Sequence, residues 1–168
     1  MSDTPRPDGH PGGLTHLDAS GAARMVDVSA KDVSARTATA TGTVLLSGEA
    51  VAALRGGGVP KGDALAVARI AGIQGAKRTP DLVPLCHPIA VHGVDVELTV
   101  VDEGVDIRAT VRTADRTGVE MEALTSVMTA ALGLVDMVKA VDPEAEVTRV
   151  RVEEKTGGKK GHWRRSGE

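Results

Sequence analysis

Large aromatic side chains are almost missing from this sequence. It contains no Phe and no Tyr, and its single Trp, Trp163, lies close to the C-terminus. Hydrophobic residues still make up 41% of the 168 positions, enough for one domain. Small aliphatic side chains each bury little apolar area, so stability requires very close packing or additional burial between subunits. We therefore expect one tightly packed domain that forms an obligate oligomer.

Composition excludes several functional classes. The formal net charge is −3, and aromatic stacking platforms are absent, so we expect no nucleic-acid binding. Cys86 is the only cysteine, which rules out an intrachain disulfide. The first residues are polar and rich in Pro and Gly, unlike a signal peptide, and no run approaches the ~18 apolar residues of a membrane span. These features predict a soluble, cytoplasmic protein with no membrane partner.

The chain divides into three parts by composition. Residues 1–15 resemble a flexible leader, and residues 156–168 resemble a flexible, basic, glycine-rich tail. Residues 16–155 between them are predicted to form a single catalytic domain.

Hydrophobic periodicity predicts the elements of that domain. Alternating residues indicate strands at 34–46, 94–100, 105–111 and 146–154, the middle pair forming a hairpin. Helical patterns cover 49–54, 63–77 and 120–141, and Pro143 ends the last. Gly72 and Gly75 interrupt the second helix, which suggests that another backbone packs closely there. This order predicts an α+β, ferredoxin-like split β-α-β sandwich, with helices on one face of an antiparallel sheet.

The longest helix carries a lysine in an unusual direction. On a helical wheel Lys139 falls inside the apolar arc, between Val135 and Leu132, and Asp136 lies at the edge of that arc. One interpretation is an i, i+3 ion pair whose lysine stem covers the core while its ammonium reaches solvent. The other is a desolvated lysine, oriented by Asp136, that acts as a general acid or base. The opposite face of the helix, with small residues such as Ala130 and Gly133, would admit a second layer or subunit.

Further candidates lie in loops and at helix ends. His87 stands between Cys86 and Pro88, in a proline-braced segment that suits a binding site, although a histidine bonded to a backbone carbonyl would also fit. We interpret Cys86 mainly as a small, buried hydrophobic residue. Glu120 and Glu122 begin the long helix, where carboxylates either complement the helix dipole or accept N–H groups of a purine-like ring.

Two lysines stand beside glycines that would let a phosphate approach. These are Lys61 and Lys155, and neither fits the spacing of a nucleotide P-loop. The sequence also lacks H-E-x-x-H, paired-cysteine and G-x-S-x-G signatures, so it predicts no metal site and no serine hydrolase.

Eight sequence strings, in order along the chain, closely resemble the MoaC family of molybdenum cofactor biosynthesis. They are residues 25–31 (MVDVSAK), 61–63 (KGD), 68–74 (ARIAGIQ), 76–79 (AKRT), 85–88 (LCHP), 118–125 (GVEMEALT), 136–140 (DMVKA) and 155–159 (KTGGK). Each string alone is weak, but together they are specific, and the resemblance runs in order from about residue 14 to residue 161.

The resemblance implies a specific reaction. Proteins of this family convert 3′,8-cyclo-7,8-dihydroguanosine 5′-triphosphate, which a radical SAM enzyme supplies, into cyclic pyranopterin monophosphate with release of pyrophosphate. It also implies a ferredoxin-like fold and a homo-hexamer built as a trimer of dimers, with active sites at dimer interfaces. The sequence requires no cofactor, and Mg²⁺ is a chemically reasonable companion of the triphosphate.

The resemblance also assigns roles to residues. It places the family's essential lysines and aspartate on Lys61, Lys139 and Asp136. It places the substrate-binding residues on Leu85, Cys86, His87, Glu120, Met121, Glu122 and Lys155. We expect Lys139 and Lys61 to share the acid and base steps, one glutamate to accept pterin-side N–H groups, and His87 and Lys155 to contact phosphate.

Two other functional classes remain as alternatives. A non-catalytic nucleotide-binding regulator would bind GTP-like ligands and form no product. A purely structural oligomerisation module would explain the small residues, but it would not explain the direction of Lys139 or the prolines around His87.

Overall fold

The first strand shows how this sequence builds a sheet from small residues. The computed structural model describes residues 17–18, 20–159 and 161–167, so most of the predicted leader lies outside the described residues. Strand β1 (Ser34–Leu45) alternates buried Ala38, Ala40 and Val44 with threonines on the other face. A Cβ added to Gly42 would lie 2.7 Å from Cγ1 of Val127, so the sheet and the helix above it touch at that point.

All the sheet partners of β1 are antiparallel. Strands β2 (Gly93–Val101), β3 (Gly104–Asp115) and β4 (Glu146–Thr156) complete the order β2-β3-β1-β4. The predicted β2–β3 hairpin is confirmed, and its turn needs glycine: Gly104 has φ +149°, and a Cβ there would lie 1.9 Å from the carbonyl oxygen of Val44.

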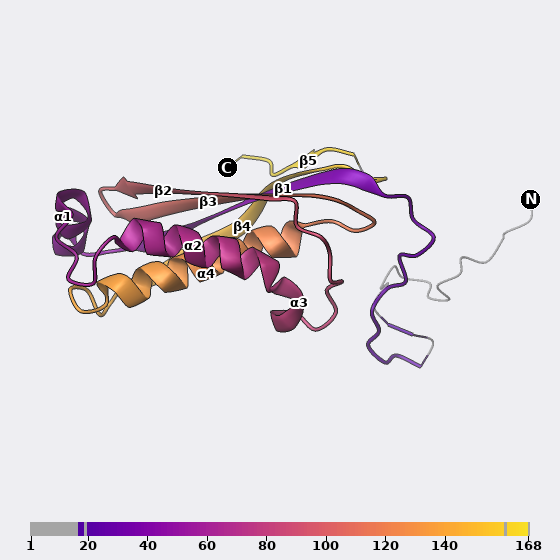
Figure 1. Ribbon diagram of the computed structural model, residues 1–168, viewed down its shortest axis with the longest axis horizontal. Helices are drawn as coiled ribbons and strands as arrows, with labels where there is room; N and C mark the ends of the chain where they lie inside the picture. The colour runs from indigo at the N-terminus through magenta and orange to yellow at the C-terminus, as the bar shows by residue number, and fades with distance from the viewer. Residues whose placement is uncertain (1–16, 19, 160, 168) are drawn as a thin grey trace, which may run out of the picture.

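The two long helices lie on one face of this sheet, as Figure 1 shows. Helix α1 (Gly48–Gly56) begins at Ser47, whose side chain accepts from the backbone N–H of Ala50. Helix α2 (Ala64–Lys77) begins in the same way at Asp63, and α4 (Glu120–Val138) packs along α2. The element order and the strand order confirm the predicted α+β, ferredoxin-like sandwich.

The contact between α2 and α4 explains the two interrupting glycines. A Cβ on Gly72 would lie 3.0 Å from the carbonyl oxygen of Ser126, and a Cβ on Gly75 would lie 1.9 Å from Oγ1 of Thr129. The predicted close approach of a second backbone is therefore confirmed. Helices this close bury small side chains efficiently, which compensates for the missing aromatic residues.

The buried face of α4 differs from the prediction. The face with Ser126, Ala130 and Met137 is buried against the sheet and α2, whereas Met128 is 50% and Leu132 68% exposed. The second interpretation of Lys139, a desolvated lysine, is therefore not met in the single chain, where its side chain is 58% exposed. A helical wheel ranks faces by hydrophobicity alone, but where α2 comes closest to α4, at Gly72 and Gly75, the facing residues of α4 are Ser126, Thr129 and Ala130.

Helix α4 is also long and apolar enough to cross a membrane by length and composition alone. Half of its most apolar 18-residue window is buried inside the fold, and Ala123, Val127 and Leu134 belong to the core cluster. Its hydropathy is that of a core helix in a soluble protein.

Two segments outside the predicted helices and strands contain regular structure. A short helix, α3 (Thr79–Leu82), follows α2 directly, with Pro80 in its first turn. In the basic tail, strand β5 (Trp163–Arg164) pairs antiparallel with β4, and the N–H of Arg165 donates to the carbonyl of Glu153 at 2.8 Å. The expectation of a wholly flexible tail was wrong here, because the edge of β4 offers backbone partners that composition does not reveal.

Candidate functional site

Three of the predicted catalytic residues meet at the C-terminal end of α4. Lys61 Nζ lies 3.0 Å from Oδ2 of Asp136, and Lys139 Nζ lies 2.7 Å from Oδ1 of the same carboxylate. Lys61 also donates to the backbone carbonyl of Asp136 at 2.9 Å. Hydrogen bonds from Lys139 and Lys61 lower the pKa of Asp136. The Asp136 carboxylate therefore stays ionised and holds both ammonium groups.

The backbone explains how these three side chains meet. Lys61 lies in the turn between α1 and α2, next to Gly62, which has φ +101°. Asp136 lies in the last turn of α4, and Lys139 is the C-cap residue of this helix. The helix dipole favours positive charge at this end. Their side chains are 42–58% exposed, so the i, i+3 ion pair of the first interpretation is present and the cluster is open to a ligand.

The other predicted residues lie around a cavity at the N-terminal end of α4. Its volume is about 340 Å³. Its lining includes Leu85, Cys86, His87, Glu120, Met121 and Glu122, which are six of the seven predicted binding residues, together with Lys31. Because residues 85–87 follow α3 and the glutamates begin α4, only the fold could bring these two segments together. We call this the acidic pocket.

Glu122 is the buried carboxyl of the acidic pocket. The residue is 3% exposed, and within the part of the chain that the structure describes its side chain has no ion-pair partner. Burial, reinforced by the charge of Glu120, raises the pKa of Glu122 to about 7. Burial and the same Glu122 charge also raise the pKa of the nearby Cys86 thiol. This pocket therefore holds a carboxyl group that can be ionised or protonated near neutral pH.

His87 is held by the segment that precedes β1. Its Nε2 donates to the carbonyl of Val26 at 2.6 Å, which is the carbonyl-bonded histidine considered in the sequence analysis. The Val26 carbonyl can only accept, so Nε2 carries a proton and Nδ1 is left for a ligand. A contact of His87 with phosphate then requires the doubly protonated, charged ring.

A second cavity, of about 310 Å³, adjoins the acidic pocket and shares Lys31, Thr117, Gly118 and Glu120 with it. We call it the basic pocket. It is lined by five cationic side chains, with Glu120 as the carboxylate among its lining residues: Lys31, Arg36, Arg116, Lys155 and Lys159. Such a surplus of positive charge suits a polyanion.

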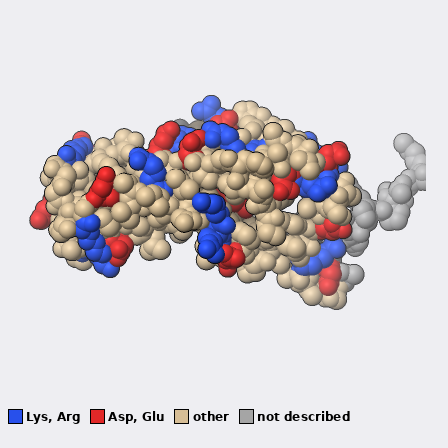
Figure 2. All heavy atoms as spheres, in the orientation of Figure 1, with Lys and Arg blue, Asp and Glu red and all other residues tan. Residues whose placement is uncertain are grey.

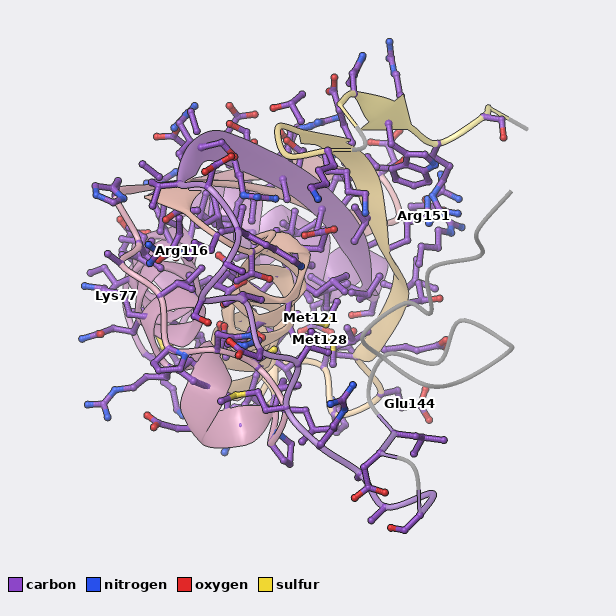
Figure 3. All side chains as sticks on the ribbon, turned by 90° about the vertical axis from the view of Figure 1, so that its right-hand side faces the viewer. Lys77, Arg116, Met121, Met128, Glu144 and Arg151 are labelled. Carbon is purple, nitrogen blue, oxygen red and sulfur yellow. The ribbon has the colours of Figure 1, made fainter. Side chains whose placement is uncertain are left out.

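The two arginines of the basic pocket are tethered through backbone carbonyls. Arg36 donates to the carbonyls of Asp115 at 2.9 Å and Arg116 at 3.3 Å, and Arg116 donates to the carbonyl of Lys31 at 2.9 Å. Neutral carbonyls hold these guanidinium groups without cancelling their charge. Figure 3 looks onto the end of the molecule that carries Arg116.

Sequence reasoning missed Arg36, Arg116 and the binding role of Lys31. Lys31 stands at the end of one of the eight strings, but Arg36 lies in an alternating strand and Arg116 follows another, so both look like solvent-facing residues. Their signal is the register of β1 with β3, which aligns Arg36 with Thr113 near the ends of both strands. That register is visible only once the strands are paired.

The tight turn after β4 completes the basic pocket. Gly157 has φ +91°, and a Cβ there would lie 2.2 Å from the carbonyl oxygen of Ala35. A Cβ on Gly158 would lie 2.3 Å from a guanidinium nitrogen of Arg36. Only glycines let this loop close over Arg36.

The two groups of predicted residues do not meet in one chain. Glu120 and Asp136 are sixteen residues apart on α4, which is about 24 Å along the helix axis. In Figure 1 the loop with Lys61 lies at the α1 end and α3 lies at the other end of the molecule. Among the described residues there is no group of three or more His, Cys, Asp or Glu that could hold a metal ion.

Comparison with known proteins identifies the family. A family model described as the MoaC family matches residues 25–158. Cyclic pyranopterin monophosphate synthase of Streptomyces avermitilis is 70% identical over 153 residues, covering 91% of this chain and 90% of the relative. The enzyme of the same name from a Nocardioides species is 66% identical over 168 residues, covering 98% and 99%. The chain belongs to the MoaC family.

Similarity extends to more distant actinobacterial members. Cyclic pyranopterin monophosphate synthase 2 of Mycobacterium tuberculosis is 56% identical over 154 residues, covering 92% of each chain. The span matched by the MoaC model contains both ends of α4 and almost the whole lining of the two pockets. The resemblance predicted from the eight strings is confirmed, and the regulatory and structural alternatives lose their support.

The raised pKa of Glu122 predicts a pH dependence of stability in this MoaC protein. The folded pKa of about 7 exceeds the ordinary value of 4.5, so the folded state binds more protons between these values. The contribution of Glu122 to the free energy of unfolding is then fully present below pH 4.5. It is lost as the pH rises to about 7, which lowers that free energy by on the order of 3 kcal/mol. Glu122→Gln should therefore be more stable than the wild type at pH 8 and gain nothing at pH 4.5.

Thermal unfolding at pH 4.5, 6 and 8 tests this prediction. Glu49→Gln is the control, because Glu49 lies exposed in the first turn of α1. A difference in Tm between wild type and Glu122→Gln that stays constant across pH would contradict the prediction.

Proposed function

We propose that this protein is a cyclic pyranopterin monophosphate synthase. It is a lyase of molybdenum cofactor biosynthesis that converts 3′,8-cyclo-7,8-dihydroguanosine 5′-triphosphate into cyclic pyranopterin monophosphate and releases pyrophosphate. The observation that carries the proposal is the 70% identity, over nine-tenths of the chain, to relatives that bear this name. Two adjoining pockets, one basic and one acidic, support it independently.

The acidic pocket suits the ring of this substrate. Pterin-like rings present N–H donors at one edge, and a carboxylate accepts such donors in pairs. Glu120 is already engaged by Lys155, whose Nζ lies 2.7 Å from its Oε1, whereas the buried Glu122 forms no ion pair among the described residues. We therefore assign ring recognition to Glu122 rather than to Glu120, a choice that the sequence left open.

The basic pocket suits the triphosphate. Pyrophosphate leaves when one phosphate closes onto the sugar, so negative charge must be stabilised on the departing group. Lys155 would supply this stabilisation together with Arg36 and Arg116, which form no ion pair among the described residues. A Mg²⁺ ion bound to the triphosphate would add to that charge and would enter with the substrate.

The catalytic lysines then come from a second copy of the chain. Met121, Met128 and Leu132 are 39%, 50% and 68% exposed and lie along one side of α4, the side that Met121 and Met128 share in Figure 3. This stripe leads from the acidic pocket toward Asp136 and Lys139. Two chains that pair their α4 helices antiparallel would bury both stripes and bring Lys61, Asp136 and Lys139 of one chain to the pockets of the other.

Assembly and supply of substrate follow from the same proposal. Three such dimers would form the homo-hexamer, and a radical SAM enzyme in the cytoplasm would provide the cyclised GTP derivative. Figure 2 shows wide uncharged areas between charged groups on one face, consistent with a surface partly covered by other subunits.

A coupled assay tests the proposed function. Purified protein receives the cyclised GTP intermediate freshly made by the radical SAM enzyme, and pyrophosphate and the oxidised fluorescent pterin are both measured. Appearance of both products supports the synthase. Binding of the intermediate without any product would favour the regulator instead.

A further inference from the structure

Glu120 stands in the wall between the two pockets. It is one of the residues that line both cavities, and its carboxylate is paired with Lys155 across 2.7 Å. The two side chains are 25% and 37% exposed, so the pair is partly shielded from water. Lys155 is thus both a cation of the basic pocket and the counter-ion of a carboxylate beside the acidic pocket.

A bound phosphate chain would compete for this lysine. Phosphate oxygens carry more charge than one carboxylate and form strong charge-assisted hydrogen bonds with ammonium groups. When Lys155 turns to the phosphates, Glu120 loses its counter-ion. The charge of Glu120 already acts on Glu122, two residues further along the chain, and favours its protonated form.

We propose that a phosphate chain in the basic pocket takes Lys155 from Glu120, and that the released Glu120 carboxylate makes Glu122 take up a proton from solvent. This inference rests on the proposed function and adds to it. The proton turns one Glu122 oxygen into a donor while the other still accepts, so occupancy of the phosphate pocket changes Glu122 from an acceptor of two ring N–H groups into a partner for one N–H group and one ring acceptor.

Other groups that face Glu122 act in both directions. Cys86 and His87, in the loop after α3, and Lys31, in the segment before β1, line the same cavity as Glu122. Lys31 favours the ionised carboxylate and so opposes proton uptake. The negative charges of Glu120 and of the phosphates favour proton uptake by Glu122. They act on Glu122 together only when Lys155 has moved away from Glu120.

Calorimetric titration with inorganic pyrophosphate tests the inference on the full chain. Titrations at pH 7.5 in two buffers of different ionisation enthalpy give the number of protons exchanged on binding. Pyrophosphate exchanges protons of its own, so the informative quantity is the difference between the wild type and Glu122→Gln. We expect the wild type to take up about half a proton more per site, for a tenfold rise in the proton affinity of Glu122.

Two further variants sharpen the test. Glu120→Gln leaves Lys155 free and removes a repelling charge, so it should bind pyrophosphate up to about tenfold more tightly and lose the extra proton uptake. Glu154→Gln, which removes a carboxylate paired with His162 at the surface, should behave like the wild type in both respects.

The outcomes separate this inference from the proposed function. Tight binding of pyrophosphate with equal proton exchange in the wild type and Glu122→Gln would overturn the inference alone. Failure of pyrophosphate to bind would also overturn it, and the coupled assay would then decide whether the synthase is active with its triphosphate held elsewhere.

Discussion

Lys139→Ala should lower kcat by about 10²- to 10⁴-fold, the usual contribution of a positioned acid or base. The Lys139 ammonium lies 2.7 Å from Asp136, close enough for this carboxylate to orient it for proton transfer. The side chain is 58% exposed in the single chain, so the variant should fold and assemble normally. The coupled assay measures the loss of turnover, and light scattering measures whether the oligomer is intact. An inactive variant that also dissociated would leave the catalytic role unsupported.

Mixed subunits test where the missing half of the site comes from. Lys139→Ala and the double variant His87→Ala/Lys155→Ala should each be inactive. The first removes the lysine at the C-terminal end of α4, and the second removes pocket residues near its N-terminal end. A dimer with one copy of each would carry one intact site and one doubly damaged site. Random mixing should then restore roughly a quarter of wild-type turnover. No recovery after verified subunit exchange would contradict sites shared between chains.

Gly75→Ala should strongly destabilise the fold. Its new Cβ would lie 1.9 Å from Oγ1 of Thr129, which donates to the carbonyl of Thr125 at 2.7 Å. Either Thr129 gives up this bond or α2 moves away from α4. We expect a loss of about 2–3 kcal/mol in the free energy of unfolding, after allowing for the better helix propensity of alanine. In a chain of this size, that lowers Tm by roughly 5–10 °C.

A matched variant and a rescue complete that test. Gly48→Ala, at the first residue of α1, meets no atom within 4 Å and should not lower Tm. Adding Thr129→Ala to Gly75→Ala should recover part of the loss. Equal stability of Gly75→Ala and Gly48→Ala would mean that α2 and α4 do not approach as closely as described.

Local sequence patterns determined the elements of this protein and their order. Alternation in residues 34–46 and 94–111 specifies strands because neighbouring side chains on a strand point to opposite faces. Ser47 and Asp63 begin helices because their side chains satisfy free N–H groups at the helix N-terminus. These signals act over a few residues, so they can be read without the fold. The eight strings likewise identified the family.

Only the tertiary structure decided which surfaces meet. Hydrophobicity placed Leu132 in the core and Lys139 beside it, but α4 buries the face with Ser126, Ala130 and Leu134, and α2 comes closest to it at the small residues. The sequence named the catalytic and binding residues together, whereas α4 holds them about 24 Å apart. Arg36 and Arg116 became visible only through the pairing of β1 with β3. Periodicity records which side of an element is apolar; the separation between elements, which decides what fits on that side, depends on contacts distant in the chain.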